Sequence, residues 1–76
     1  MERLIKLAIM SSDYAEAFVA GLMYAVRVYE DGEMMEYQYG NIKHATEHYD
    51  WETKADKVEL VEYSTITGTE ETIRSK

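Results

Sequence analysis

Two histidines in the middle of the chain have a spacing that permits metal chemistry. His44 and His48 lie four residues apart in the string HATEH. Residues at this spacing share one face of a helix, so both imidazole rings could bind one zinc ion. The residue types and their spacing are therefore compatible with half of a zinc site.

A zinc-dependent hydrolase needs more than this pair. The string HATEH matches the H-x-x-E-H pattern of one class of zinc proteases. Such an enzyme also needs a third ligand, a carboxylate that activates water and a closed cleft. A chain of 76 residues offers little scaffold for that cleft. We therefore interpret His44 and His48 as solvent-facing side chains of an amphipathic helix, and we expect no tightly bound metal and no cofactor.

The sequence contains none of the other common catalytic patterns. It has no cysteine, and its four glycines form neither a phosphate-binding loop nor a dinucleotide-binding fingerprint. A G-x-S-x-G nucleophile turn is missing as well. The acidic string at Glu30, Asp31 and Glu33 lacks the twelve-residue ligand spacing of an EF-hand. The sequence therefore predicts a protein that is not an enzyme.

Charge is distributed very unevenly along the chain. The sequence has 15 acidic residues against 8 lysines and arginines, a net charge of −7. Residues 29–71 hold twelve acids and three lysines, which gives −9, whereas residues 1–28 balance to zero. Such a field repels nucleic acids and anionic lipids and attracts basic surfaces. We therefore expect no direct nucleic-acid binding, no membrane binding, and a basic nucleic-acid-binding protein as the partner.

Length bounds the architecture. Residues 1–76 suffice for a single domain. A chain this short buries only about 60% of the surface that its unfolded form exposes. It has no cysteine to form a disulfide, so we expect a homodimer to add buried surface. The apolar run over residues 4–10 is too short to span a bilayer and has no signal-peptide cleavage site, so the expected location is the cytoplasm.

The clearest local pattern is a β-hairpin over residues 24–39. Asp31-Gly32 is a typical type I′ turn pair, because both central positions of that turn need a positive φ. A two-residue turn at this point separates alternate side chains onto two faces. The predicted core face pairs Val28 with Met35, Val26 with Tyr37, and Tyr24 with Tyr39. The predicted outer face pairs Arg27 with Glu36 and Tyr29 with Met34. We expect four of the core-face residues to be buried, namely Val26, Val28, Met35 and Tyr37.

Two helices are predicted, one on each side of this hairpin. Residues 3–10 have the composition of a strand, and Asp13 and Glu16 follow with a capping-box spacing. This predicts a helix over residues 14–20, with Gly21 placed to end it, although residues 22–25 could equally extend the helix or begin the next strand. Asn41 is a good N-cap for the second helix. Its apolar stripe consists of Ile42, Ala45 and Tyr49.

The C-terminal third completes the predicted fold. Residues 50–57 are predicted to form a polar connection in which Trp51 is buried. Residues 58–66 then form a strand, and residues 70–74 a final edge strand. The predicted fold class is α+β, a small antiparallel sheet with two short helices. The order of elements is that of a ferredoxin-like β-α-β-β-α-β arrangement with an added C-terminal strand.

Carboxylates are the strongest candidates for a functional surface. Alternate residues on a strand face are about 6.6–7 Å apart and helix neighbours about 5–6 Å, which is similar to the charge spacing of a nucleic-acid backbone. Tyr29 and Met34, on the predicted outer face, would add contact points of the kind that interfaces favour. The predicted partner-binding residues are these two and Glu30, Asp31, Glu33, Glu36, Glu47, Asp50, Glu59 and Glu62. The alternative is that the acids only keep the protein soluble.

In size, acidity, lack of cysteine and hairpin–helix–hairpin layout, the chain resembles small phage-encoded host-takeover inhibitors that act as DNA mimics. One such protein, from a Bacillus phage, targets the nucleoid protein HU. The resemblance implies a stoichiometric inhibitor that blocks the basic DNA-binding face of its target in the host-cell cytoplasm. The first alternative is a small dimeric structural or regulatory subunit with incidental acidity. A minimal metal-dependent hydrolase at His44 and His48 is the second alternative.

Overall fold

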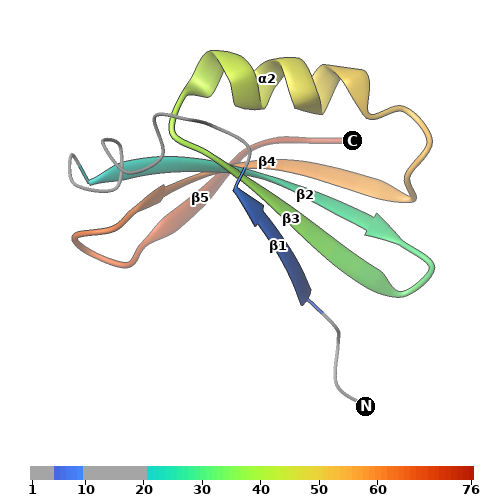
Figure 1. Cartoon of the computed structure of the whole chain (residues 1–76), viewed down its shortest axis with the longest axis horizontal. Helices are drawn as coiled ribbons and strands as arrows, with labels where there is room; N and C mark the ends of the chain where they lie inside the picture. The colour runs from blue at the N-terminus through green and yellow to red at the C-terminus, as the bar shows by residue number, and fades with distance from the viewer. Residues whose placement is uncertain (1–4, 10–20) are drawn as a thin grey trace.

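One sheet and one helix form the part of the chain that the structure describes. The computed structural model describes residues 5–9 and 21–76, with side chains for residues 21–76. The five strands lie in the order β1-β3-β2-β4-β5, and α2 crosses one face of the sheet (Figure 1). The elements are β1 (Ile5–Ile9), β2 (Leu22–Glu30), β3 (Glu33–Tyr39), α2 (Ile42–Trp51), β4 (Lys57–Ser64) and β5 (Glu70–Ser75). The predicted α+β class is confirmed.

The predicted ferredoxin-like order is wrong. Strands β3, β2, β4 and β5 are antiparallel neighbours, but β1 joins the edge of β3 in parallel, so the sheet is mixed. Because β1 occupies the outer edge of β3, the free edge of the hairpin is that of β2, and β4 pairs there. The residues described contain one helix instead of the predicted two. The helix predicted over residues 14–20 lies outside them.

The β2–β3 hairpin has the predicted register. Asp31 and Gly32 have φ angles of 53° and 78°, as a type I′ turn requires. Val26 lies opposite Tyr37, and Val28 lies opposite Met35. A slip of one residue would exchange the two faces of β3, so this short turn decides which side chains meet α2.

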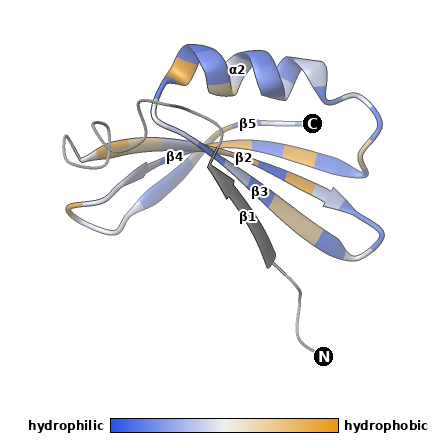
Figure 2. Cartoon of the chain, viewed as in Figure 1, coloured by the Kyte–Doolittle hydropathy of each residue, from blue (hydrophilic) through white to orange (hydrophobic). Residues whose placement is uncertain are grey.

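The main core lies between the sheet and α2. Figure 2 shows hydrophobic and hydrophilic residues alternating along the strands, as expected for sheet faces with different surroundings. The core side chains come from three strands and the helix, and they are Val26, Val28, Tyr39, Ala45, Tyr49, Val58 and Leu60. Of the four residues predicted to be buried, Val26 and Val28 are buried, whereas Met35 and Tyr37 are only half-buried.

Helix α2 begins where the sequence predicts. The side-chain oxygen of Asn41 accepts hydrogen bonds from the backbone N–H groups of Lys43 and His44, at 2.7 and 3.4 Å. The helix continues two residues into the predicted polar connection and includes Asp50 and Trp51. The prediction that Trp51 is buried is wrong, because this side chain is 78% exposed. None of the helices among the described residues has the length and apolar character needed to cross a bilayer.

The face of the sheet that points away from α2 is also largely buried. Met23, Ala25 and Val61 on this face have no exposed surface. Met34 and Glu36 are each 8% exposed, which contradicts their predicted place on a solvent-facing side. The sheet therefore has buried side chains on both faces, and a residue's place on the outer side of the hairpin does not make it accessible.

Arg27 connects three strands on this second face. Its guanidinium donates to Glu36 on β3 and Glu70 on β5, each at 2.7 Å. The side chain of Gln38 donates a further hydrogen bond to Glu36 at 2.8 Å. Burial by itself would lower the pKa of Arg27, but the hydrogen bonds and charges of Glu36 and Glu70 outweigh it and raise that pKa. Glu36 is therefore a structural partner of Arg27.

We expect Glu36→Gln to lower the free energy of unfolding by about 1–3 kcal/mol, because Arg27 loses a charged hydrogen-bond acceptor. Glu33→Gln is the matched control, since Glu33 is exposed at the end of the same strand. It should change the free energy by less than about 0.5 kcal/mol. Urea unfolding followed by circular dichroism measures both values. Equal effects of the two substitutions would contradict the structural role of Glu36.

Candidate protein-interaction surface

The predicted carboxylate array does not form one continuous surface. Glu30, Asp31 and Glu33 are exposed at the hairpin turn, and Glu47 and Asp50 are exposed on α2. The other predicted contact residues are not on that surface. Glu36 and Met34 are buried on the far face, and Tyr29, Glu59 and Glu62 are half-buried. The hydroxyl of Tyr29 donates to Glu59, so these two residues are partners of each other.

Four exposed carboxylates gather at the end of the β2–β3 hairpin, which we call the acidic tip (Glu30, Asp31, Glu33 and Asp56). Glu30 and Glu33 lie directly opposite each other across the turn. Asp56 reaches the same place because its carboxylate accepts a hydrogen bond from the backbone N–H of Asp31 at 3.2 Å. None of the ion pairs within residues 21–76 involves these four side chains. The acidic tip is therefore a concentration of negative charge without a described basic partner.

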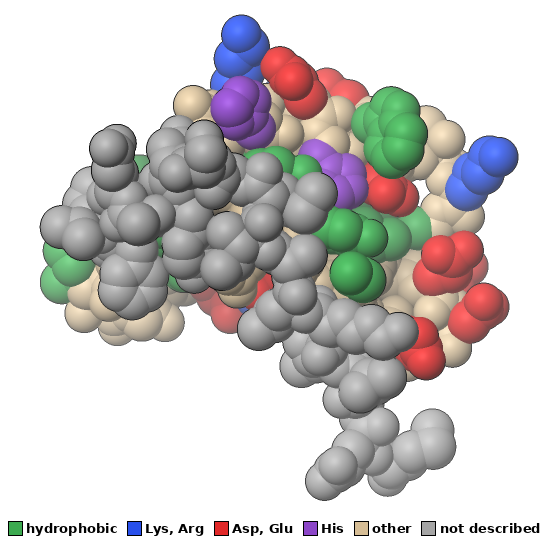
Figure 3. All heavy atoms as spheres, in the orientation of Figure 1, with side chains coloured by type: hydrophobic (Ala, Val, Ile, Leu, Met, Phe, Trp, Pro, Cys, Tyr) green, Lys and Arg blue, Asp and Glu red, His purple; other side chains and the backbone are tan. Residues whose placement is uncertain are grey.

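An open groove of about 510 Å³ lies between α2 and β3, close to the tip. We call it the aromatic groove, and its lining residues are Tyr37, Tyr39, His44, Glu47, His48, Trp51 and Glu52. Figure 3 shows this face, with both histidines and several hydrophobic side chains among acidic ones. Acidic side chains also gather at the right of that view, where Figure 1 places the β2–β3 turn. A smaller hollow of about 260 Å³, lined by Glu30, Asp31 and Glu33 among others, shares Tyr37 and Glu52 with the groove.

His48 organises the wall of this groove. Its Nδ1 is 2.5 Å from the hydroxyl of Tyr39, and its Nε2 is 3.3 Å from a carboxylate oxygen of Glu52. The ring of Tyr37 packs against the imidazole edge to face, at 4.5 Å between centroids. With only 11% of its side chain exposed, His48 is not the solvent-facing residue that we predicted. His44 is exposed, in agreement with the prediction.

These contacts leave little room for a metal at His48. Both ring nitrogens already have hydrogen-bond partners. Among the described residues, no group of three or more histidine, aspartate or glutamate side chains is arranged to hold a metal ion. In the neutral imidazole, one nitrogen accepts from Tyr39 and the other donates to Glu52, so both ring nitrogens are used. The arrangement therefore serves to orient the aromatic wall and to hold Glu52 in place.

We expect zinc to leave the thermal unfolding midpoint of the protein unchanged. Binding at His48 would have to break its hydrogen bonds to Tyr39 and Glu52. The test compares unfolding in excess zinc with unfolding in a chelator, together with a calorimetric zinc titration. One zinc ion bound per chain, with binding lost in His44→Ala, would contradict this expectation.

Tyr39 should make the stability of the fold depend on pH in alkaline solution. Burial, followed by the neighbouring Tyr37 and Glu52, raises the pKa of Tyr39 above its ordinary value. A raised pKa means that the fold favours the neutral phenol. The corresponding stability is complete below the ordinary tyrosine pKa of about 10 and is lost as the pH rises through the folded-state pKa. The wall should therefore weaken only in strongly alkaline solution.

We expect the free energy of unfolding to fall as the pH rises above about 10. The fall should be smaller in Tyr39→Phe, which has no phenol to ionise. Burial and then Glu62 raise the pKa of Tyr24, so a fall should remain in this variant. Urea unfolding at a series of alkaline pH values measures the slope. The same slope in the parent protein and in Tyr39→Phe would contradict the assignment.

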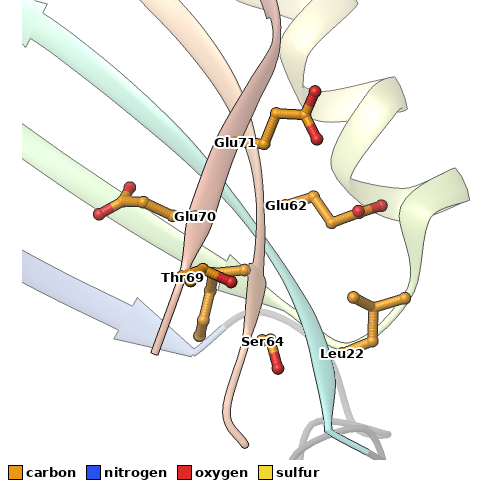
Figure 4. Close-up of a pocket in the computed structure, with 7 residues that line it drawn as sticks. Leu22, Glu62, Ser64, Thr69, Glu70 and Glu71 are labelled. Carbon is orange, nitrogen blue, oxygen red and sulfur yellow. The ribbon is translucent and has the colours of Figure 1, made fainter. Parts of the chain in front are cut away.

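A second hollow lies beside strands β4 and β5, and it is also rich in carboxylates. Figure 4 shows Glu62 and Glu71 directed toward the helix side of the sheet, whereas Glu70 points the other way. Glu62 and Glu71 are cross-strand neighbours, and Glu70 is the ion-pair partner of Arg27. The three carboxylates therefore do not converge on one ligand position, and this hollow is not a candidate site.

Four residues of the groove were not predicted to belong to a binding surface, namely Tyr37, Tyr39, Trp51 and Glu52. A usable signal was present, because His44, Glu47, His48 and Trp51 follow the i, i+3, i+4, i+7 spacing of one helix face. The strand that forms the other wall could not be identified in this way. Its position against α2 depends on how the helix packs across the sheet.

Comparisons with known proteins add no relative. No family model, no curated protein and no solved structure matches this chain.

Proposed function

We propose that this protein is a non-enzymatic interaction module, an inhibitor that blocks a basic nucleic-acid-binding protein through the acidic tip and the aromatic groove. The observation that carries the proposal is the acidic tip, where four exposed carboxylates stand together without a described base. Like charges held this close repel each other in the free protein. A basic partner would relieve that repulsion, and it would be steered toward the tip before contact.

The aromatic groove supplies the aromatic side chains that the acidic tip lacks. Charge at an exposed rim mainly affects association rate and specificity, whereas affinity depends on well-packed aromatic anchors. The hollow next to the tip shares Tyr37 and Glu52 with the groove, so one partner could cover both. A polar rim around an aromatic depression is typical of a protein-binding surface, and here the rim is acidic.

DNA mimicry is the mechanism that we propose for this surface, with a smaller set of carboxylates than the sequence predicted. Glu36, Glu59 and Glu62 do not take part, because they are buried or half-buried. The acids that remain are Glu30, Asp31 and Glu33 at the turn and Glu47 and Asp50 on α2. The partner would meet them with the surface that it uses for phosphates. Duplex DNA and this protein should therefore compete for it.

We expect the double charge reversal Glu30→Lys/Glu33→Lys to slow association with the partner about tenfold at low salt. The control is Glu62→Lys/Glu71→Lys. Each pair changes the net charge by four units, from −7 to −3. The protein is immobilised and exposed to a bacterial lysate, retained proteins are eluted with a salt gradient and identified by mass, and their association rates are then measured. We expect DNA-binding proteins that elute at moderate salt and are displaced by excess duplex DNA.

Equal slowing by both double reversals would show that only net charge matters, and it would remove the acidic tip from the proposal. A partner that binds this protein and duplex DNA at the same time would rule out mimicry.

The alternative is a small dimeric subunit whose acidity is incidental. Two exposed apolar side chains favour it, since Leu22 and Ile66 lie at the same end of the sheet, near the β4–β5 turn. Burial of such residues drives self-association that salt does not weaken. Light scattering at low and high salt separates the two functions. A stable dimer at both salt concentrations, with no partner retained from lysate, would favour the subunit.

A further inference from the structure

We infer that the aromatic groove binds an arginine side chain of the basic partner. This inference rests on the proposed function and names the chemical group that the groove recognises. A ligand of the groove should be a cation that can stack on an aromatic ring and also reach a carboxylate. The groove offers both kinds of surface within one depression.

Trp51 supplies an exposed aromatic surface in the groove. It is the single tryptophan of the chain and lies in the last turn of α2 with 78% of its surface exposed. Exposed tryptophan faces are costly to hydrate and are common anchors in interfaces. Tyr37, which is half-buried, provides a second aromatic surface on the opposite wall. A planar cation placed over either ring would gain from the cation–π interaction.

The carboxylates of the groove define the charge of its ligand. Glu47 is exposed on α2, and Glu52 follows Trp51 directly. His48 holds Oε1 of Glu52 at 3.3 Å, and no hydrogen bond from a described residue occupies its Oε2. A held carboxylate with a free oxygen is a good acceptor for a charged donor. The same two glutamates disfavour a phosphate or any other anion.

The protein already makes this type of contact with its own cations. The ammonium group of Lys76 lies 4.6 Å from the ring centroid of Tyr49. That of Lys57 lies 5.6 Å from the centroid of Tyr29 and also 3.7 Å from the carboxylate of Glu59. The second case combines an aromatic ring and a carboxylate around one cation. The groove repeats this combination with Trp51, Tyr37 and the two glutamates, but without a cation of the described chain.

Arginine fits the groove better than lysine for geometric reasons. A guanidinium is planar and weakly hydrated, so it can stack on an indole ring while its N–H groups donate sideways to a carboxylate. An ammonium group is a strongly hydrated point charge that cannot do both equally well. DNA-binding proteins present arginine for the same reason toward phosphates. The partner's arginine would therefore meet Glu47 or Glu52 in place of a phosphate.

Trp51 also provides the measurement, because it is the single tryptophan of the chain and lines the groove. The probe is a short peptide with three arginines separated by glycines. The matched peptides contain lysine, leucine or citrulline, which has the shape of arginine without its charge. We expect a saturable change of the Trp51 signal with the arginine peptide and binding about tenfold weaker with citrulline. The lysine peptide should be intermediate, and the leucine peptide should give no saturable change.

Single and double substitutions separate the contribution of the groove to binding from that of the acidic tip. Glu47→Gln, at an exposed position, should weaken binding of the arginine peptide about threefold to tenfold. Glu71→Gln is the control outside the groove, and it should have no effect. Glu30→Lys/Glu33→Lys should reduce the affinity for the peptide less than it reduces the affinity for the whole partner. Circular dichroism of each variant confirms that the fold is retained.

Equal binding of the arginine and citrulline peptides, or of the arginine and leucine peptides, would overturn the inference. An unchanged Trp51 signal together with salt-sensitive retention of a DNA-binding protein would overturn it as well, while leaving the proposed function standing. If the arginine peptide binds as expected but no basic protein is retained, the groove assignment holds and the proposed inhibitor function fails.

Discussion

The two-residue turn at Asp31 and Gly32 is the constraint on which most of the structure depends. Its positive φ angles allow β3 to return beside β2 in a single register. That register directs Tyr37 and Tyr39 toward α2, and it directs Glu36 toward Arg27 on the other face. A slip of one residue would place the tyrosines on the Arg27 side and a glutamate against the helix. The core, the Arg27 ion pairs and the wall of the aromatic groove therefore share one local cause.

The acidic residues of this protein perform two different physical roles. Glu36 and Glu70 neutralise Arg27 on the central strand, and Glu59 accepts from Tyr29. These carboxylates are occupied, so they contribute to stability and little to the outer field. The residues of the acidic tip are exposed and unpaired with described bases, so their charge acts on solvent and on approaching molecules. Net charge alone would not reveal this division.

The aromatic groove shows how a small fold can build a rigid binding surface. One wall is a helix face and the other is a strand, both of which are regular elements with fixed side-chain directions. His48 joins the walls through its contacts with Tyr39 and Glu52, so the groove is shaped before any ligand arrives. Preformed walls reduce the entropy that is lost on binding, which favours recognition by few residues.

Local order was predictable from the sequence, and the arrangement of the elements was not. The turn, the hairpin register and the Asn41 cap each depend on residues close together in the chain, and all three are as predicted. The strand order was missed because hydrophobic alternation does not tell which edge of a hairpin the next strand will pair with. The burial of Met34 and Glu36 and the exposure of Trp51 were missed for a related reason. Whether a side chain is covered depends on elements that are distant in sequence, and only their packing brought Trp51, Tyr37 and Glu52 to one groove.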